Sequence, residues 1–471
     1  MLDQSFSAHN FEIIFNIENR KGNVDISSMS EAYQHAISRI NDNKERCKVL
    51  KRKKKADRTE EECEEIEQLE SEMTNLQQEK AKALADDLAS IADEVNGRNF
   101  TFSMDKHLFK DKEEFTLNKS RASFYAMKQL MYNMKRAFKI EMPGRHQIMT
   151  SIKPLLNMKM PIFIVRTDIK SFYESIPQDK LLNKVYDNGL LSFKSKSFIK
   201  QVFQEYERIK NTSLTSAGKG VPRGIGISAM LSEVYMQDID RKLKSRTGVI
   251  FYARYVDDIF IITTSIYPFD NIDAYYKNLQ EEFKCFGLTL QANDSKKYKL
   301  VAYHPDSFKP VNFEYLGYRL NMSESNNGLK TMFLLSKDKK DKIKKRIDNA
   351  FLHFETLSKK DVKAARRDLL DSLDYITGNF RLSNAKGRAK VGLYYNSNLI
   401  DAFEDLEGFT KSLHHRIISP YDGLFADPSD RQRFIDALKK RICKIDFTER
   451  WKERKMCDFS LNRIAEISSW L

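Results

Sequence analysis

Two adjacent acids stand in the middle of an apolar run, "FYARYVDDIFIIT" at residues 251–263. The β-branched and aromatic residues on both sides of Asp257 and Asp258 predict two short strands joined by a tight turn at residues 256–258. Such a hairpin would lift both acids to the edge of a sheet. Neighbouring carboxylates repel each other, and one is driven towards protonation unless a cation holds the pair. Taken alone, a polar turn that caps two core strands is the simpler interpretation.

A third acid upstream favours a metal site. In "PIFIVRTDIKSFYESIP", residues 161–177, an apolar strand predicted at 162–165 leads to Asp168 and then to a helix. We expect Asp168 to meet Asp257 across adjacent strands. Three carboxylates at one sheet edge suit two Mg²⁺ ions, with Mn²⁺ as an alternative, because these cations prefer oxygen ligands. One ion would activate a 3′-hydroxyl as the nucleophile, and the other would hold nucleotide phosphates and the leaving pyrophosphate.

A glycine-rich segment separates these acids in the sequence. The stretch "GKGVPRGIGISAML" occupies residues 218–231 and leads into a pattern typical of a helix. Its glycines permit the backbone to approach a base pair or a phosphate closely. A turn of this kind is by itself more common as a linker. The order of acid, glycine turn and double acid, however, indicates a nucleotidyl transfer site.

In this order the segments resemble the motifs of reverse transcriptases. The similar segments are "DIKSFY" from Asp168, "GVPRGIGIS" from Gly220, "YVDD" from Tyr255, "FGLTLQANDSKKYKL" at 286–300 and the primer-grip hairpin "FEYLGYRL" at 313–320. The resemblance implies that Asp168, Asp257 and Asp258 are the catalytic metal ligands and that the Ile169 carbonyl is a further one. In the primer grip, it implies contacts from Tyr315, Leu316 and Gly317.

The same resemblance implies residues that contact the incoming nucleotide. Tyr173 matches the steric gate, an aromatic ring that excludes a ribose 2′-hydroxyl; a core aromatic beside Phe172 is the alternative. Either Lys296 or Lys297 would lie near the leaving pyrophosphate. Gly224 follows Arg223, which stands where most relatives carry Gln, so Arg223 could add phosphate affinity or alter the choice of template.

A fingers segment is also similar. In "RAFKIEMPGRHQIM", residues 136–149, Lys139 and Arg145 are expected to contact the triphosphate. Arginine suits this role because its forked donors match a phosphate.

Composition limits the class of protein. The chain has 471 residues, 41% of them hydrophobic, enough for about two to four structural units, and its net charge of +14 favours a polyanionic partner. With neither an apolar span nor a leader, a soluble cytoplasmic protein without membrane contact is expected. The five cysteines form no CxxC pair and the histidines no metal motif, so reduced thiols and no zinc site are predicted.

The predicted fold class is α+β, a right-hand polymerase of fingers, palm and thumb with a helical insertion and a helical C-terminal extension. The predicted domains are an N-terminal segment at 1–29, a helical hairpin insertion at 30–98, fingers and palm at 99–330 with the palm at 160–320, and the thumb with its extension at 331–471. The hairpin carries a basic block, "KVLKRKKKADR", followed by an acidic block. The basic block could grip nucleic acid or pair with the acidic one.

Within the family, the helical flanks and the segment at 375–400 are similar to bacterial defence-associated reverse transcriptases, including the abortive-infection kind. The opening residues suggest the branch encoded beside a second reverse transcriptase and a non-coding RNA. This resemblance implies antiviral DNA synthesis from dNTPs on an RNA template, with a non-coding RNA, a DNA product, and a second reverse transcriptase subunit or a homo-oligomer as partners.

Three other functions remain open from the sequence. A template-independent or protein-primed DNA polymerase would use the same palm chemistry. A nucleic-acid-binding scaffold with an inactive palm is a further alternative, although the retention of all three acids opposes it. An RNA polymerase with this palm is disfavoured by Tyr173 and by the sequence YVDD.

Overall fold

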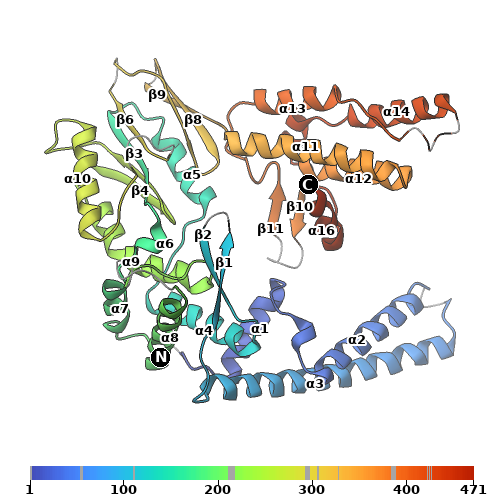
Figure 1. Cartoon of the computed structure of the whole chain (residues 1–471). Coiled ribbons are helices and arrows are strands. Elements are labelled where there is room, and N and C mark those ends of the chain that lie inside the picture. Colours follow the sequence, from blue (N-terminus) through green and yellow to red (C-terminus); the bar gives the residue numbers. More distant parts are fainter. Residues whose placement is uncertain are drawn as a thin grey trace. The chain divides into compact units, whose positions relative to one another are not determined.

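The chain folds into two compact units in the computed structural model, and each unit is assembled from separate segments of the sequence (Figure 1). Unit 1 comprises Met1–Met142, Ile169–Lys242 and Glu281–Leu290, and unit 2 comprises Pro143–Asp168, Leu243–Gln280 and Gln291–Leu471. The structure describes residues 3–53, 57–109, 112–210, 218–291, 297–304, 307–326, 328–382, 389–421, 423, 425 and 427–471. No helix in these ranges combines the length and apolar character that a membrane span requires.

Unit 1 is predominantly helical. Its elements are α1 (Ala8–Arg20), a 3-10 helix (Ile26–Ser28), α2 (Glu31–Leu50), α3 (Glu60–Asn96), β1 (Met104–Phe109), β2 (Lys112–Leu117), α4 (Arg121–Ala137), α6 (Phe172–Ser175), α7 (Gln178–Tyr186), α8 (Phe193–Lys210) and most of α9 (Gly226–Lys244). The strands β1 and β2 pair as an antiparallel hairpin. The apolar faces of α1, α3 and α4 pack together and form a core that includes Phe11, Leu88 and Tyr125.

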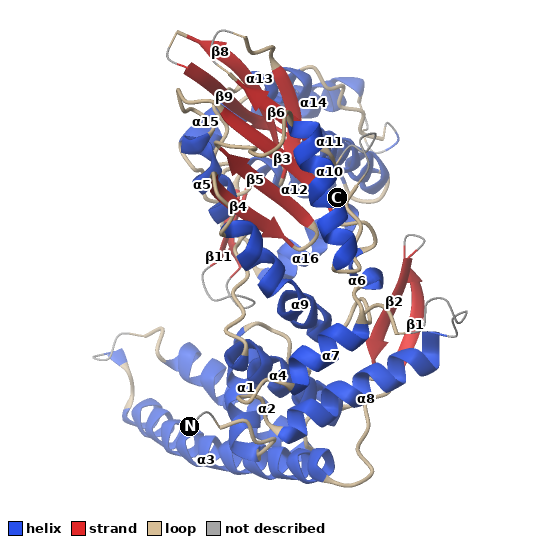
Figure 2. Ribbon diagram, turned by 90° about the vertical axis from the view of Figure 1, so that its left-hand side faces the viewer, coloured by secondary structure: helices blue, strands red, loops and turns tan. Residues whose placement is uncertain are grey.

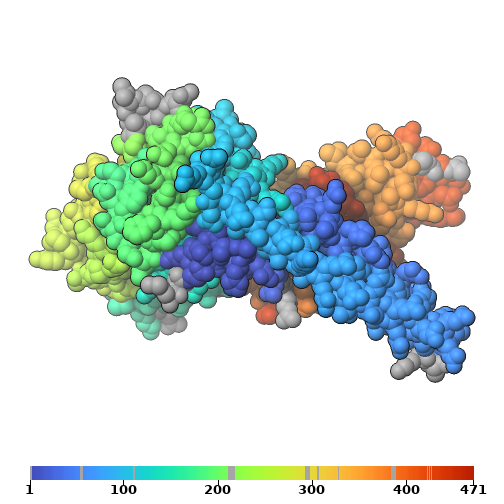
Figure 3. All heavy atoms as spheres, turned by 90° about the horizontal axis from the view of Figure 1, so that it is seen from below, coloured from blue at the N-terminus to red at the C-terminus, as the bar shows by residue number. Residues whose placement is uncertain are grey.

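Helices α2 and α3 form a long hairpin, shown in blue in Figure 3 as an arm that extends from the rest of unit 1. Thr59 caps α3 in a capping box with Glu62, which fixes the point at which the second helix begins. Ion pairs join the two helices, at 2.5 Å for both Arg46–Glu65 and Lys51–Glu70. Lys51 and Lys53 of the basic block therefore pair with Glu70 and Glu62 of the acidic block, as one of the two interpretations of the sequence expected.

The side chain of Glu18 ties α1 to α4. It is 4% exposed and accepts hydrogen bonds from Lys128 and Lys21 at 2.7 Å and from Asn23 at 2.8 Å. Burial by itself would raise the pKa of Glu18, but these hydrogen bonds outweigh it and lower the pKa to about 2. The carboxylate is thus favoured in the folded state.

We expect Glu18→Gln to lower the free energy of unfolding by about 2 kcal/mol at neutral pH, because it removes charge-assisted hydrogen bonds from a buried acceptor. A depressed pKa stabilises the fold above the unfolded-state value of about 4.5, and this contribution is lost as pH falls towards about 2. Urea unfolding across that pH range should therefore show that the difference in the free energy of unfolding between wild type and variant decreases as the pH falls. A gap that stays constant with pH would contradict the assignment.

Unit 2 contains two main sheets (Figure 2). One has the strand order β4 (Val249–Tyr255), β5 (Asp258–Thr263), β3 (Ile162–Asp168), β6 (Lys299–Tyr303), and the other the order β7 (Val311–Tyr315), β8 (Tyr318–Ser325), β9 (Gly328–Leu335). All neighbouring strands are antiparallel. Every residue of β3 is buried, so both of its faces are covered, which explains its nearly continuous apolar sequence.

Helices complete unit 2. They are α5 (Arg145–Leu155), most of α10 (Ile272–Cys285), α11 (Lys337–Ser358), α12 (Val362–Thr377), α13 (Glu404–His414), α14 (Pro428–Ile442), α15 (Phe447–Lys452) and α16 (Leu461–Trp470), with a hairpin of β10 (Asn379–Leu382) and β11 (Ala389–Gly392) after α12. One hydrophobic core joins the sheets to α5 and to α11 through α15 and includes Ile164, Phe260, Phe333 and Phe354. This core fixes the edge of the first sheet, where the acids lie.

Candidate active site

The strands β3 and β5 bring the three acids together. Asp168 is the last residue of β3, Asp258 is the first of β5, and the two are direct partners across the antiparallel ladder. Asp257 lies in the turn between β4 and β5. One carboxylate oxygen from each residue lies within 4.8 Å of the others. The expected meeting of carboxylates across adjacent strands is therefore confirmed, although Asp258, and not Asp257, is the ladder partner of Asp168.

The β4–β5 turn is strained. Val256 has a φ of 60°, a conformation that a β-branched residue rarely adopts. The buried side chain of Arg254 donates a hydrogen bond of 2.8 Å to the Val256 carbonyl and so stabilises the turn. Backbone strain of this kind persists only where surrounding contacts enforce it, and it concentrates at functional sites. The turn places Asp257 beside Asp168 at this cost.

Burial, followed by repulsion between the carboxylates, raises the pKa of two of the three acids. Burial raises the pKa of Asp168, which is 3% exposed; Lys297 opposes this shift and Asp257 adds to it. Burial also raises the pKa of Asp258 to about 6, with Asp168 and Asp257 adding to the rise, although Arg166 lies 3.4 Å away and opposes it. Because these carboxylates bind a proton more tightly than ordinary ones do, a further cation placed between them would be stabilised.

Lys297 is the lysine that contacts the acids. Its Nζ lies 2.9 Å from Asp168 Oδ1 and 3.5 Å from Asp257 Oδ2. Lys296, the other lysine considered for this role, lies outside the described residues. Gln291 donates to Asp168 through both its backbone, at 2.9 Å, and its side chain, at 3.3 Å. The ammonium group of Lys297 therefore occupies space beside two carboxylates that a divalent cation would need.

We expect Lys297→Ala to lower the free energy of unfolding by about 1 kcal/mol in metal-free buffer, since the ion pairs of this half-exposed side chain are screened by solvent. We also expect Mg²⁺ to raise the melting temperature of the variant more than that of the wild type, because the competing ammonium is gone. Calorimetry with and without Mg²⁺ measures both, with Lys309→Ala as the control for a surface lysine. An equal response to Mg²⁺ would show that Lys297 does not compete.

The predicted nucleotide contacts are divided between the units. Ile169, Tyr173, Arg223, Gly224 and Lys139 belong to unit 1. Ile169 is buried and pairs with Leu290, and Lys139 follows the end of α4. Arg145 instead belongs to unit 2, where it begins α5 and its guanidinium lies 4.7 Å from the Tyr255 ring centroid. The structure thus does not bring Lys139 and Arg145 together in one unit, and their roles stay predictions.

Within unit 1, the glycine turn meets the helix that follows β3. Arg223 Nη1 lies 3.3 Å from Glu174 Oε1, and its guanidinium is 5.9 Å from the Tyr173 ring centroid. Gly224 has a φ of 103°, and a Cβ there would lie 2.6 Å from the carbonyl oxygen of Phe115. Only glycine allows β2 to approach so closely. Arg223 is therefore held beside the predicted steric gate.

The primer-grip hairpin forms the β7–β8 turn of unit 2. Tyr315 is 1% exposed and its ring packs against Phe260 with centroids 4.7 Å apart, so this ring belongs to the core. Leu316 and Gly317 form the turn, both with positive φ. A contact with a primer would therefore have to come from the turn and its backbone, since the ring of Tyr315 is enclosed.

Sequence reasoning missed three polar residues that support the acids: Arg166, Arg254 and Gln291. Arg166 and Arg254 are both buried, at 7% and 6% exposure. A signal was present for the arginines, because each interrupts an otherwise apolar strand and a buried charge requires a partner. No comparable signal identifies Gln291.

Comparison with known proteins gives the family. The family model described as reverse transcriptase (RNA-dependent DNA polymerase) matches residues 79–320, slightly more than half of the chain and the part that holds the three acids. No curated protein matches the chain.

Solved telomerases are similar at a low level. The C-terminally truncated apo telomerase of Candida tropicalis is 11% identical, with 55% of this chain and 69% of that chain covered and a TM-score of 0.30. Candida tropicalis telomerase with the TWJ fragment of telomeric RNA is 11% identical, with 78% of this chain and 74% of that chain covered and a TM-score of 0.31. The Candida albicans telomerase with this fragment is 14% identical, with 73% of this chain and 53% of that chain covered and a TM-score of 0.27. The chain thus spans about half of the Candida albicans protein.

The family match therefore carries the assignment, and it confirms the α+β polymerase fold predicted from the motifs. This chain belongs to the reverse transcriptase family, the RNA-dependent DNA polymerases, which are nucleotidyltransferases.

Proposed function

We propose that this chain is an active RNA-directed DNA polymerase that adds deoxynucleotides to a 3′-hydroxyl. The observation that carries the proposal is the convergence of Asp168, Asp257 and Asp258 within 4.8 Å of one another, in the segment that matches the family. An inactive scaffold would have no need to keep three repelling carboxylates together, because such a cluster costs stability without a cation.

The acids fit a pair of divalent metal ions. Their oxygens are close enough to share ions, the donor set is all oxygen, and burial together with mutual repulsion leaves charge to be neutralised. Asp168, Asp257 and Asp258, with the Ile169 carbonyl, would hold Mg²⁺, and Mn²⁺ would suit the same ligands. When bound, such ions lower the pKa of the 3′-hydroxyl and stabilise the charge that develops on the leaving pyrophosphate.

The other residues would bind and orient the substrates. Lys297, or Lys296, would donate to the pyrophosphate, and Lys139, Arg145 and Arg223 would contact the triphosphate or the template. Tyr173 would exclude ribonucleotides, with Gly224 giving the backbone room near the nucleotide. The turn of Tyr315, Leu316 and Gly317 would hold the primer end.

The proposed domain organisation follows the motifs. Residues 160–320 would form the palm within a fingers and palm domain at 99–330, the segment at 1–29 and the helical hairpin at 30–98 would precede it, and the thumb with the helical C-terminal extension would occupy 331–471. The net charge of +14 supports an RNA template and a DNA product as partners.

We further propose that the polymerase acts in antiviral defence in the cytoplasm of a bacterium, with a non-coding RNA and either a second reverse transcriptase or further copies of itself. The support is the resemblance of residues 375–400 and of the opening residues to defence-associated relatives. Phage plaque counts on a bacterial host that expresses the chain with its neighbouring genes would test this. Equal protection by Asp257→Ala would contradict a role for DNA synthesis in defence.

Labelled nucleotide incorporation tests the polymerase. Purified protein is incubated with Mg²⁺ and each labelled dNTP or rNTP, with and without co-purifying RNA. Incorporation of deoxynucleotides that disappears after RNase treatment is the expected result. RNase-resistant synthesis would instead indicate the untemplated or protein-primed polymerase, and absence of incorporation would favour the scaffold.

A further inference from the structure

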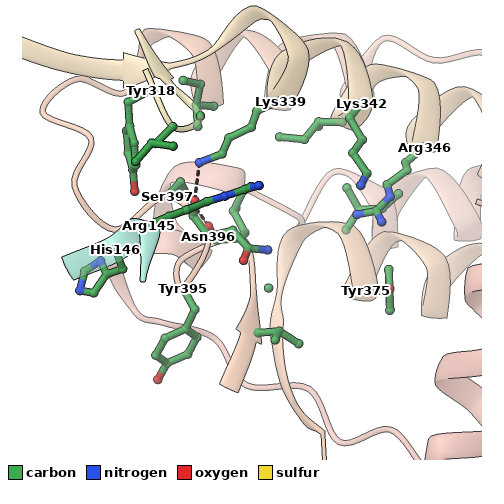
Figure 4. A pocket seen from close by; sticks show the side chains of 18 of the residues that line it. Arg145, His146, Tyr318, Lys339, Lys342, Arg346, Tyr375, Tyr395, Asn396 and Ser397 are labelled. Carbon is green, nitrogen blue, oxygen red and sulfur yellow. Dashed lines mark hydrogen bonds between the residues drawn. The ribbon is translucent and has the colours of Figure 1, made fainter. Parts of the chain in front are cut away.

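A pocket of about 580 Å³ lies within unit 2, outside the acid site (Figure 4). It is bounded by α11, α12, the β10–β11 hairpin and the segment that follows it, together with the start of α5 and the β7–β8 turn. Most of these elements lie beyond residue 320, where the family match ends. Its volume is in the range typical of small-molecule sites.

Four cations line this pocket. Lys339, Lys342 and Arg346 project from one face of α11, because residues three and four apart lie on the same side of a helix, and Arg145 reaches in from α5. No Asp or Glu is among the described residues that line it. In Figure 4 the charged ends of Lys342 and Arg346 point to the same space above Tyr375. The pocket is therefore suited to an anion with more than one charged oxygen.

Aromatic rings and backbone hold two of these cations in place. Lys339 Nζ lies 4.2 Å from the Tyr318 ring centroid and donates a hydrogen bond of 2.5 Å to the Asn396 carbonyl. The Arg346 guanidinium lies 5.6 Å from the Tyr375 ring centroid. Burial and the nearby charge of Arg145 lower the pKa of Lys339 to about 8. Cations that are oriented and partly desolvated before binding interact more strongly with an incoming phosphate.

The path of Lys339 depends on the β7–β8 turn. A Cβ at Gly317 would lie 2.8 Å from Lys339 Cε, so a side chain at this position would displace the lysine. The remaining wall is apolar and includes Ile343, Phe380 and Val391. A cluster of cations at one side and an apolar wall at the other match a molecule that is charged at one end and flat or apolar at the other.

We propose that this pocket binds a nucleotide phosphate, with the sugar and base against the apolar wall, as a second nucleotide site separate from the three acids. Lys339, Lys342 and Arg346 bind the phosphate oxygens. The same chemistry is offered by a free nucleoside triphosphate and by the phosphorylated 5′-end of a strand. Binding of phosphate in this pocket does not require polymerase activity.

Calorimetric titration of the full chain with dATP in EDTA tests the site, because removal of divalent ions suppresses nucleotide binding at the acids. We expect saturable binding of dATP. Deoxyadenosine, which lacks phosphate, should bind at least about tenfold more weakly. Lys342→Ala with Arg346→Ala should weaken dATP binding by about tenfold or more. Photocrosslinking with 8-azido-dATP should label peptides within 339–397.

The matched control is Lys344→Ala with Lys345→Ala, which removes two positive charges from the same helix at exposed positions outside the pocket. Its affinity for dATP should stay within about twofold of wild type if the pocket and not the general charge binds phosphate. Both double variants change partly or fully exposed residues, and equal melting temperatures would show that they fold. The proposal would be overturned if both double variants lost equal affinity for dATP, or if deoxyadenosine bound as tightly as dATP. It would also be overturned if neither dATP nor a 5′-phosphorylated strand bound in EDTA.

Short single strands that differ only in a 5′-phosphate or 5′-hydroxyl distinguish the two sources of the phosphate. Tighter binding of the phosphorylated strand than of dATP, lost in the Lys342→Ala, Arg346→Ala variant, identifies a strand end as the occupant. Binding of dATP that neither strand displaces identifies a free nucleotide. Each result supports the pocket as a phosphate site, whereas displacement by both strands alike contradicts recognition of the terminal phosphate.

Discussion

Asp257→Ala is expected to reduce DNA synthesis by on the order of a thousandfold or more. The side chain is one of three carboxylates that would hold the divalent ions, and a metal ion supplies several kcal/mol of charge stabilisation in the transition state, where each 1.4 kcal/mol corresponds to about a factor of ten in rate. Because Asp257 lies in a turn and is only partly buried, its removal should leave the fold intact. Primer extension on an RNA template measures the rate.

Two comparisons make this result specific. Asp270→Ala removes an exposed acid shortly after β5 and should leave the rate within about twofold, as expected for a surface substitution. RNA affinity of Asp257→Ala, measured by filter binding, should equal that of the wild type, since the acid repels and does not bind the polyanion. Synthesis at the wild-type rate in Asp257→Ala would exclude the two-metal assignment.

The acids could be predicted because their signal is local. The apolar run before Asp168 and the runs on both sides of Asp257 and Asp258 have the composition of strands, and the strands form at these positions as β3, β4 and β5. The polar break in each run marks the sheet edge. The pairing of β3 with β5, which is antiparallel, then brings the acids at the ends of these strands together. The composition of these short segments and the pairing of two strands were therefore sufficient to predict that the acids meet.

The support around the acids could not be predicted in the same way. Lys297 reaches Asp168 across 129 positions of the sequence, and two adjacent lysines gave no basis for a choice between them. Arg166 sits two residues before Asp168 in β3 but contacts Asp258 from the neighbouring strand, so its partner depends on the register. Sequence periodicity specifies which face a side chain occupies, whereas the identity of its charged partner is fixed by tertiary packing.

The phosphate pocket illustrates the same limit at longer range. Arg145 and Lys339 line one cavity although almost two hundred residues separate them, and the sequence placed Arg145 only in a fingers segment. The basic pattern of α11 is typical of a solvated helix, and nothing local distinguishes Lys342 and Arg346 from Lys344 and Lys345. Only the position of the helix against α12 and the β10–β11 hairpin does so.

Tyr173→Ala is expected to raise the efficiency of rNTP use relative to dNTP use by roughly a hundredfold, the scale of discrimination that a steric contact in a tight pocket provides. Phe172 is 4% exposed and belongs to the core, whereas the neighbouring Tyr173 is only partly buried, so the core-aromatic alternative describes Phe172 better. The Tyr173 carbonyl accepts a hydrogen bond of 2.8 Å from the Val221 backbone, which anchors the residue to the glycine turn. Single-nucleotide incorporation of each rNTP and dNTP gives the ratio.

Tyr173→Phe is the matched control, because it keeps the ring that would meet a 2′-hydroxyl and removes only the phenol oxygen. Its preference for dNTPs should therefore match that of the wild type. If Tyr173→Ala instead leaves the rNTP to dNTP ratio unchanged while lowering both rates, the ring supports Arg223, 5.9 Å away, and does not exclude the ribose. Arg223→Gln then separates these roles, since it removes the cation over the ring and should change triphosphate affinity without changing the choice of sugar.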